Sequence, residues 1–424
     1  MTDCRTRRAV PFVSAMAGVV LLAGCGTLPG GTDGTTGPIV VMTWAPQNTG
    51  ATNMPGMPAM AKTYAKYVNA RGGIGGRELK VITCNDHNNS LGAGDCAQRA
   101  ADEGAVAVVG SYSQYGAAFT STLEAEGIPY LGGYGITQDE FESPLSYPVN
   151  GGLPALMAGA GRQLAGKCDK VSLVRPDTAA GDIFARFLDA GLRDAGRTSA
   201  TDLRAAEDAT DYNTVSRQAI GANKPGDCVS AALGDKTATF FDAFRRTTTT
   251  DPVTGGEEGP KAQIASVLGS VQQSTLDSTG GGNSPLEGAY ITGWYPPASD
   301  SRWALMRNTI KRYAFGDNDI DPNDPGVQTT WIAYTALTAV IQKMGKDQAI
   351  TAPTLKQALD AAHDVSTDGL TPALGWREQD AAAVIEQPRL VNGWVTFQKV
   401  ENGRLVAARK GFVDVRGTLE DAPG

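Results

Sequence analysis

The feature of this sequence that most constrains its fold is an alternation of short apolar segments with amphipathic segments. A short apolar run bounded by turn residues favours a β-strand, whereas apolar side chains three or four residues apart favour a helix. Strands that alternate with helices form parallel sheets whose two faces the helices cover. The first series predicts strands at 38–43, 79–83, 106–110 and 128–131, with helices at 60–68, 93–103 and 116–126.

A second alternating series follows and predicts a second unit of similar size. A long helix is expected at 327–344, and β-like segments at 390–400 and 404–415 return the chain to the folded body. The expected fold class is therefore α/β, with two doubly wound parallel-sheet lobes. The second series predicts helices at 153–165, 183–195, 212–222 and 237–246 and strands at 171–174 and 228–233.

The N-terminal segment has the layout of an export signal. Three arginines precede a mostly apolar run at 9–23, which is shorter than the roughly 20 residues of a membrane-spanning helix. The run ends in a Leu-Ala-Gly-Cys motif that resembles the bacterial lipoprotein box, in which Cys25 would be lipidated. The alternative is an ordinary secretory signal with an incidental cysteine. We expect a signal peptide at 1–24 and a flexible tether at 25–37, which would hold an exported protein at the outer face of the cell membrane.

The charge balance argues against nucleic acid as a partner. The chain has 37 basic and 45 acidic residues, and removal of the signal peptide leaves 34 and 44, a net charge of −10. An acidic protein is not attracted to a phosphate backbone or to anionic lipid headgroups. We therefore expect no nucleic-acid partner and a membrane association through the lipid anchor alone.

Four of the six cysteines remain once the first is cleaved with the signal peptide and the second is lipidated. An even number of cysteines in an oxidising location indicates disulfides, and three connectivities are possible. We favour Cys84–Cys96, a short local loop, together with Cys168–Cys228, because the latter two each open a hydrophobic run and could lie on adjacent strands. A zinc site is the alternative, but the sequence has no Cys-x-x-Cys pair and only two histidines.

The sequence contains little that could support catalysis. His87 and His363 lie in no metal-binding motif, and no Gly-x-Ser-x-Gly motif occurs. Segment 161–168 resembles a phosphate-binding loop, but it is expected to end a helix and precede a strand, the reverse of the required order. Segment 317–321 begins like a calcium loop but has Pro322 at the glycine position. We therefore expect no enzyme, no cofactor and no metal site.

Five short segments, in a set order and spacing, carry a resemblance to a known family. The chain resembles type I periplasmic solute-binding proteins of the leucine/isoleucine/valine-binding (branched-chain amino acid ABC transporter) branch from about residue 39 to residue 300. The segments are Asn-Ala-Arg-Gly-Gly-Ile-Gly-Gly-Arg-Glu-Leu at 69–79, Cys-Asn-Asp at 84–86, Ala-Val-Val-Gly-Ser at 107–111, Gly-Ile-Pro-Tyr-Leu at 127–131 and Gly-Tyr-Gly-Ile-Thr at 133–137.

The resemblance implies two lobes joined by a multi-strand hinge, with the ligand in the cleft between them. The first lobe would comprise residues 38–152 plus 288–368, and the second lobe residues 153–287 plus 369–415. Open α/β sheets bind ligands beyond the carboxyl ends of their strands, so the loops at 110–116 and 132–138 are the expected site in the first lobe.

The resemblance also implies which side chains of the first lobe bind the ligand. Ser113 and Thr137 fall where relatives hold an amino acid's carboxylate, and Ser111 is the alternative to Ser113 in register. Hydroxyls and helix-start N–H groups can bind a carboxylate without a full positive charge. The Gly135 carbonyl would accept a hydrogen bond from a ligand ammonium. The aromatic walls would come from Tyr115 and Tyr134.

The second lobe departs from the family pattern. Relatives have tyrosine before glycine where this chain has Ala180 and Gly181, and a glutamate for the ligand's amino group where the nearest alignment places Leu268. A buried ammonium without an anionic partner is costly, so Asp177 or Asp235 would have to replace that glutamate. A carboxylate, an amide or another small polar solute fits the sequence equally well.

The function implied by the resemblance is solute capture for an ABC importer. The expected partners are a small-molecule solute and the ABC permease subunits, and the protein is expected to be a monomer. The alternative is a lipid-anchored sensor that uses the same two lobes to signal through a membrane partner.

Overall fold

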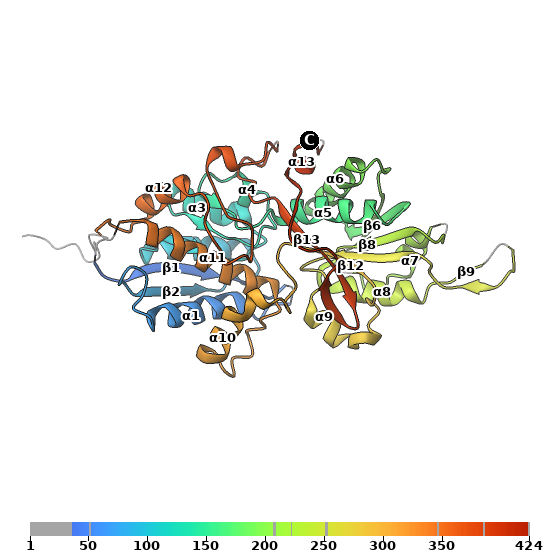
Figure 1. Ribbon diagram of the computed structural model, residues 1–424, viewed down its shortest axis with the longest axis horizontal. Coiled ribbons are helices and arrows are strands. Elements are labelled where there is room, and N and C mark those ends of the chain that lie inside the picture. Colours follow the sequence, from blue (N-terminus) through green and yellow to red (C-terminus); the bar gives the residue numbers. More distant parts are fainter. Residues whose placement is uncertain are drawn as a thin grey trace, which may run out of the picture.

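The structure, a computed structural model, has two α/β lobes side by side, with strand β13 (Trp394–Glu401) at their junction (Figure 1). The predicted α/β fold with two helix-covered sheets is confirmed. Cys25 and the predicted signal peptide lie outside the described residues. Among the residues described, no helix is long and apolar enough to cross a membrane. The structure describes residues 36–50, 52–206, 209–221, 223–250, 253–345, 347–384 and 386–422.

The first lobe contains a five-stranded parallel sheet in the order β2-β1-β3-β4-β5. The side chains of β1 alternate between two cores: Val41 packs on the face that α1 and α11 cover, and Met42 packs on the face of α2 and α3. The strands are β1 (Ile39–Trp44), β2 (Leu79–Cys84), β3 (Ala107–Val109), β4 (Tyr130–Leu131) and β5 (Ser146–Tyr147). The helices are α1 (Gly56–Asn69), α2 (Ser90–Asp102), α3 (Gly116–Glu126), α4 (Asp139–Glu142), α10 (Ala304–Tyr313), α11 (Pro325–Lys343) and α12 (Ala352–Ala361).

The second lobe contains a sheet in the order β14-β13-β12-β11-β8-β6-β7, and β15 (Val413–Asp414) pairs with β13. Within this sheet the strands β12, β11, β8, β6 and β7 run parallel to one another, whereas β13 and β14 are antiparallel to their neighbours. The remaining strands are β6 (Lys170–Pro176), β7 (Thr201–Ala205), β8 (Asp227–Ala231), β11 (Gln263–Val267), β12 (Tyr290–Gly293) and β14 (Arg404–Ala407). The helices are α5 (Gly152–Ala165), α6 (Ala179–Asp194), α7 (Asn213–Ile220), α8 (Thr237–Arg245), α9 (Gln273–Ser278) and α13 (Arg416–Glu420).

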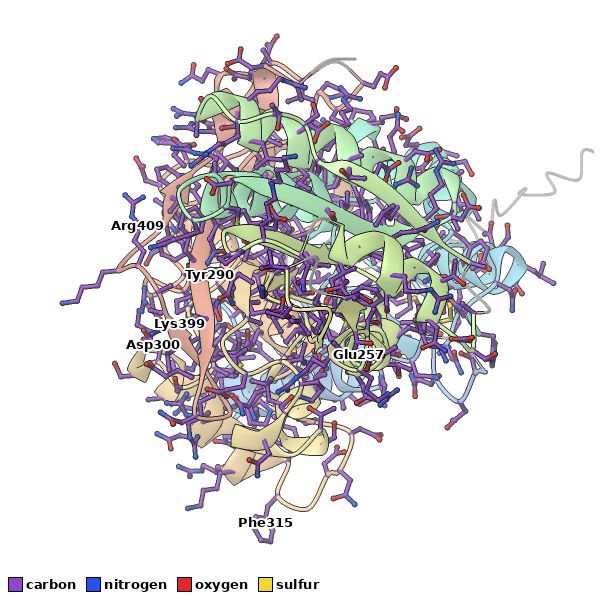
Figure 2. The ribbon with its side chains drawn as sticks, turned by 90° about the vertical axis from the view of Figure 1, so that its right-hand side faces the viewer. Glu257, Tyr290, Asp300, Phe315, Lys399 and Arg409 are labelled. Carbon is purple, nitrogen blue, oxygen red and sulfur yellow. A yellow bond between two sulfur atoms is a disulfide. The ribbon has the colours of Figure 1, made fainter. Side chains whose placement is uncertain are left out.

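Strands β7, β11 and β12 are absent from the pattern predicted from the sequence. Strand β7 is an edge strand with mostly exposed side chains, so it contains no apolar run. Strand β12 has only four residues, and Tyr290 pairs with Lys399 of β13 near the viewer in Figure 2. A short hairpin of β9 (Thr249–Thr250) and β10 (Glu257–Glu258) projects from this lobe.

The chain crosses between the lobes at three places. Hydrogen bonds join these crossings: Asn150 Nδ2 donates to Tyr295 Oη at 2.9 Å, and Asn392 Nδ2 donates to the Pro148 carbonyl at 2.9 Å. Strand β12 belongs to the second sheet, although residues 288–368 were expected in the first lobe. Conversely, Trp376 Nε1 donates to the Pro148 carbonyl at 2.8 Å, so part of the segment expected in the second lobe lies on the first.

Both predicted disulfides are present. Cys84, at the end of β2, is bonded to Cys96 of α2, and Cys168, just before β6, is bonded to Cys228 of β8. Cys228 lies opposite Val171 in the parallel pairing of β6 with β8, so this disulfide links adjacent strands as expected. The other disulfide ties an edge strand to the helix that covers it.

Candidate functional site

Loops at the carboxyl ends of the strands meet where the two lobes face each other. In the first lobe, the loops after β3 and β4 lie side by side, because the Tyr134 N–H donates to the Ser111 carbonyl at 3.0 Å. Helix α11 passes close behind them: a Cβ at Gly110 would lie 3.0 Å from the Thr330 Cα. The start of α11 therefore extends beyond the strand ends, toward the second lobe. This is the edge at which open α/β sheets bind ligands.

The hydroxyls of the loop after β3 already have partners within the protein. Ser111 Oγ accepts from the Trp44 N–H at 3.1 Å, and Ser113 Oγ accepts from the Tyr115 N–H at 3.2 Å. Both serines are buried, whereas Tyr115 is half-buried at the start of α3. Burial raises the pKa of Asp86, and a hydrogen bond with Ser113 opposes that rise. These contacts hold the loop in shape.

The loop after β4 is held by a buried carboxylate, that of Glu140, which is 3 % exposed. Its Oε1 accepts from the N–H groups of Ile136 and Thr137 at 3.0 and 3.1 Å and from Thr137 Oγ1 at 3.2 Å. Its Oε2 accepts from the Gly135 N–H at 3.1 Å. Burial raises the pKa of Glu140, and these donors oppose the rise. The Gly135 carbonyl accepts from the Leu153 N–H at 3.0 Å.

Tyr134 extends from the first lobe to the second. Its ring lies 5.3 Å from that of Tyr112 and 5.2 Å from that of Trp294, which follows β12, and both contacts are edge-to-face. Its Oη lies 3.1 Å from the position that a Cβ would take at Gly269, in the loop after β11. Tyr134 is 6 % exposed, and burial raises its pKa well above the usual value.

Burial is the main cause of the raised pKa of Tyr134, and the charges of Asp324 and Asp235 add to the rise. Asp324 caps the start of α11, where its Oδ1 accepts from the Val327 N–H at 2.9 Å. Burial raises the pKa of Asp324 to about 6, and the charges of Asp321 and Asp235 add to the rise. Asp235 belongs to the exposed turn after β8 and comes from the opposite lobe. Among the described residues, neither Asp324 nor Asp235 forms an ion pair.

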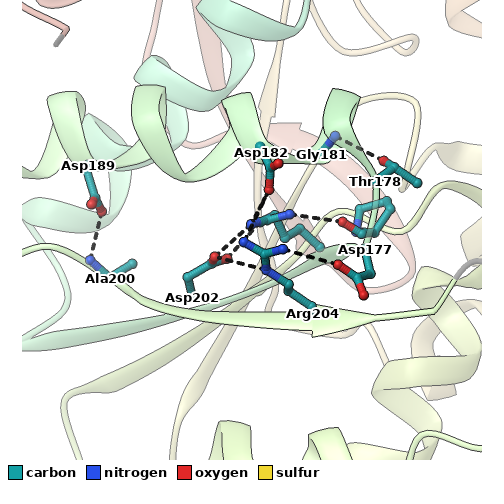
Figure 3. A network of polar contacts seen from close by, with 10 residues as sticks. Asp177, Thr178, Gly181, Asp182, Asp189, Ala200, Asp202 and Arg204 are labelled. Carbon is teal, nitrogen blue, oxygen red and sulfur yellow. Dashed lines mark hydrogen bonds and ion pairs between the residues drawn. The ribbon is translucent and has the colours of Figure 1, made fainter. Parts of the chain in front are cut away.

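The second predicted acidic residue, Asp177, belongs to a network of ion pairs (Figure 3). Its Oδ1 accepts from Arg204 Nη1 at 3.3 Å. The buried Arg175 forms two hydrogen bonds of 2.7 Å to Asp202, which raise the pKa of its guanidinium, and it also pairs with Asp182. The carboxylate of Asp177 therefore already has a cationic partner.

Gly181 has a structural role at the start of α6. Its N–H donates to Thr178 Oγ1 at 3.1 Å, which caps the helix. A Cβ at this position would lie 2.4 Å from the Pro176 carbonyl oxygen, so only glycine fits without a shift of the backbone. In the described part of the chain, no group of three His, Cys, Asp or Glu side chains could hold a metal ion.

The structure adds residues that the sequence reasoning missed. The spacing of Thr137 and Glu140 matches the capping-box pattern, which could have identified Glu140 as an internal partner of this loop. Asp324 followed by Pro325 is a helix-start signal. No sequence signal shows that Tyr112, Trp294 and Gly269 converge on Tyr134.

Comparison with known proteins agrees with the observed fold. Among solved structures, the chain is similar to a fatty acid ABC transporter substrate-binding protein from Thermomonospora curvata, with a TM-score of 0.71, 16 % identity and coverage of 93 % of this chain and 96 % of that one. It is also similar to a possible leucine/isoleucine/valine-binding protein from Rhodopirellula baltica, with a TM-score of 0.69, 12 % identity and coverage of 89 % and 98 %.

A third similar structure is a solute-binding protein of an ABC transporter from Rhodopseudomonas palustris in complex with 3,4-dihydroxybenzoic acid, with a TM-score of 0.65, 14 % identity and coverage of 91 % and 99 %. No curated protein matches the sequence. The family model of the periplasmic binding proteins matches residues 47–392, which is most of the chain. The protein therefore belongs to the periplasmic binding protein family, in its type I fold.

Proposed function

We propose that this protein is the solute-capturing component of an ABC importer, held outside the cytoplasm by a lipid on Cys25. Family membership supports extracytoplasmic solute binding. The ligand would bind between the lobes, and closure around it would form the surface that the permease subunits recognise. The observed strand pairings support a division into two lobes that the chain connects near residues 150, 294 and 392.

The observation that carries the proposal is the contact between Tyr134 of the first lobe and the Gly269 loop of the second. Both loops follow the carboxyl ends of parallel strands, where this class of sheet binds ligands. Of the predicted ligand residues, Tyr134 and Asp235 lie at this junction, and we propose them as contacts. Ser113 remains a candidate on the family resemblance, although its Oγ accepts a hydrogen bond from the Tyr115 N–H.

The first experiment is a thermal-shift screen of the mature protein against amino acids, amides, carboxylates, amines and neutral polar solutes. A ligand at 100 times its dissociation constant adds about 2.7 kcal/mol of stability, which gives a clear rise in melting temperature. Tyr134→Ala should abolish that rise, whereas Glu126→Gln, an exposed change at the far end of α3, should leave it intact.

The second experiment measures uptake of the stabilising solute by cells with and without this gene. Uptake that depends on the gene supports the importer role. Unchanged uptake contradicts it and favours the sensor. Mass spectrometry of the N-terminal peptide tests the anchor, and an unmodified Cys25 in membrane-extracted protein would contradict lipidation.

A further inference from the structure

The charge of this acidic protein is unevenly distributed over its surface. Helices α1 and α10 of the first lobe pack against each other, and neither contains an acidic residue (Figure 1). In the described part of the chain, none of the exposed cations on α1, on α10 and in the turn after α1 forms an ion pair, whereas Arg99 and Arg246 each pair with a carboxylate one helical turn away. These unpaired cations are Lys62, Lys66, Arg71, Lys311 and Arg312.

Contacts around Tyr313 bring these cations together. Lys66 Nζ donates to the Tyr313 carbonyl at 3.4 Å, and the Arg312 guanidinium lies 5.5 Å from the centre of the Tyr313 ring. The rings of Tyr67 and Tyr313 meet edge-to-face at 6.4 Å, and the Arg71 guanidinium lies 3.9 Å from the centre of the Tyr67 ring. We call the five cations the α1–α10 patch.

Exposed apolar side chains lie beside the patch. Phe315 follows the end of α10 by two residues and is 89 % exposed. In Figure 2 it projects from the lower end of the molecule, the end at which α10 lies in Figure 1. Leu305, two turns before Arg312 on the same face of α10, is exposed as well. Apolar side chains next to lysine and arginine are typical of surfaces that bind at a membrane interface.

The chain enters the folded body next to the patch. Arg77 Nε, in the turn after α1, donates to the Gly37 carbonyl at 2.9 Å, and Arg71 belongs to the same turn. The predicted tether ends at Gly37, and its length from Cys25 corresponds to roughly 40 Å of extended chain. The folded body is therefore joined to the tether beside the patch, within reach of a membrane that holds a lipid on Cys25.

The acidic residues that follow Phe315 lie toward the other end of α1. Asp317 Oδ1 accepts from the Asp319 N–H at 3.1 Å. A Cβ at Gly56, the first residue of α1, would lie 2.8 Å from the Asp319 carbonyl oxygen, whereas Arg71 follows the last turn of this helix. The surface around Tyr313 therefore keeps an excess of positive charge, although the chain as a whole is acidic.

We infer that the α1–α10 patch binds the anionic phospholipid surface to which the lipid on Cys25 holds the protein. Each lysine or arginine near such a surface adds to the attraction, and the Phe315 ring can insert between the headgroups. An acidic protein surface would match the same charges, but the position of the tether favours the membrane. The net charge predicted no attraction to anionic lipid, because it averages over the whole surface. The inference rests on the proposed function, since it requires the lipid anchor.

The test measures vesicle binding by the mature chain with Cys25→Ser, which lacks only the lipid. Co-sedimentation gives its partition coefficient on vesicles of phosphatidylcholine and on vesicles of phosphatidylcholine mixed with phosphatidylglycerol. We expect about 10-fold stronger binding to the anionic vesicles at low salt. The difference should decline as salt is added, because salt screens charges at the surface.

Variants then assign the binding to the patch. Lys311→Gln together with Arg312→Gln should lower the partition coefficient on anionic vesicles about 10-fold. Phe315→Ser should lower it several-fold, because the ring is lost from the interface. Arg409→Gln together with Lys410→Gln is the matched control and should leave it unchanged, since this exposed pair follows β14 of the second lobe (Figure 2). Urea unfolding shows whether each variant is as stable as the parent.

Three results would overturn the inference. Equal binding to both kinds of vesicle would mean that the patch does not bind anionic lipid. Equal losses in the patch variant and the control variant would mean that the binding is not located at the patch. Vesicle binding that is absent in the parent, combined with solute uptake that is lost in the Lys311/Arg312 variant, would assign the patch to an acidic protein partner.

Failure of the inference is distinguishable from failure of the proposed function. Mass spectrometry of Cys25 and the thermal-shift screen measure lipidation and solute capture without reference to the patch. If both succeed and the vesicle result is negative, the inference alone fails. If Cys25 is unmodified and no solute stabilises the protein, the proposed function fails and the inference fails with it.

Discussion

Replacement of Asp324 by asparagine should stabilise the protein at neutral pH. The carboxylate is enclosed by protein and faces other acids, and its pKa is raised from 3.8 to about 6. Because the native state then holds this proton more tightly than the unfolded state does, stability is greatest below pH 4 and falls as the pH rises toward 6. Asparagine caps a helix start as well as aspartate does, so the variant should lose the charge but keep the cap.

The magnitude follows from the pKa. A rise of about two units corresponds to roughly 3 kcal/mol of unfolding free energy at pH 7. Asp324 as a whole keeps some exposed surface, so screening by water lowers the expected gain to about 1–2 kcal/mol. Urea unfolding followed by circular dichroism between pH 4 and pH 8 measures it. The gain should vanish near pH 4, where the carboxyl is neutral in both states.

The outcome that refutes this reasoning is a stability difference that does not change with pH. Such a result would mean that the carboxylate is well solvated in the native state. A less stable variant at pH 7 would mean that Asp324 has a favourable partner. Glu126→Gln provides the control, because its carboxylate is exposed and its removal should shift stability little at any pH.

Three further changes should destabilise the protein. Replacing both Cys168 and Cys228 by serine opens a 60-residue loop and should cost about 4 kcal/mol in urea unfolding, and an unchanged midpoint would contradict this. Gly161→Ala puts a Cβ 2.1 Å from the Leu188 carbonyl oxygen where α5 crosses α6, so it should cost about 2–3 kcal/mol; a neutral effect would mean that the helices can separate. Glu140→Ala leaves three loop N–H groups without their acceptor and should lower stability by about 3 kcal/mol, and hydrogen exchange at Ile136 that stays slow would argue against it.

Local patterns predicted most of the fold. The strands and helices of the first lobe follow from runs and spacings within about 20 residues, and β1 to β4 and α1 to α3 appear where they were expected. Strand β7 was missed because it lies at the edge of its sheet and buries little. Strand β12 was missed because a run of four residues is too short to show a hydrophobic periodicity. Its hydrogen-bonded pairing with β11 and β13 holds this segment as a strand.

The site was less predictable than the fold. The structure places the loops after β3 and β4 at the junction of the lobes, whereas their role as the ligand site stays a prediction. The family resemblance assigned ligand roles to hydroxyls and N–H groups that are bonded internally. Thr137 illustrates the difficulty: its hydroxyl and N–H both donate to Glu140. The roles of the predicted ligand residues stay predictions until a solute is bound.

The sequence by itself determined the fold class, and it predicted the export signal and the short Cys84–Cys96 disulfide, because each depends on residues that are close in the chain or on the periodicity of single elements. It favoured Cys168–Cys228 among three connectivities, and the pairing of β6 with β8 brings these two cysteines together across 60 residues. Only the tertiary structure decided what meets at the junction. Tyr112, Tyr134, Gly269 and Trp294 come from four segments far apart in the chain, and their approach depends on how the two sheets pack. Periodicity shows which face of an element is buried, but it carries no information on which loops of different lobes come together.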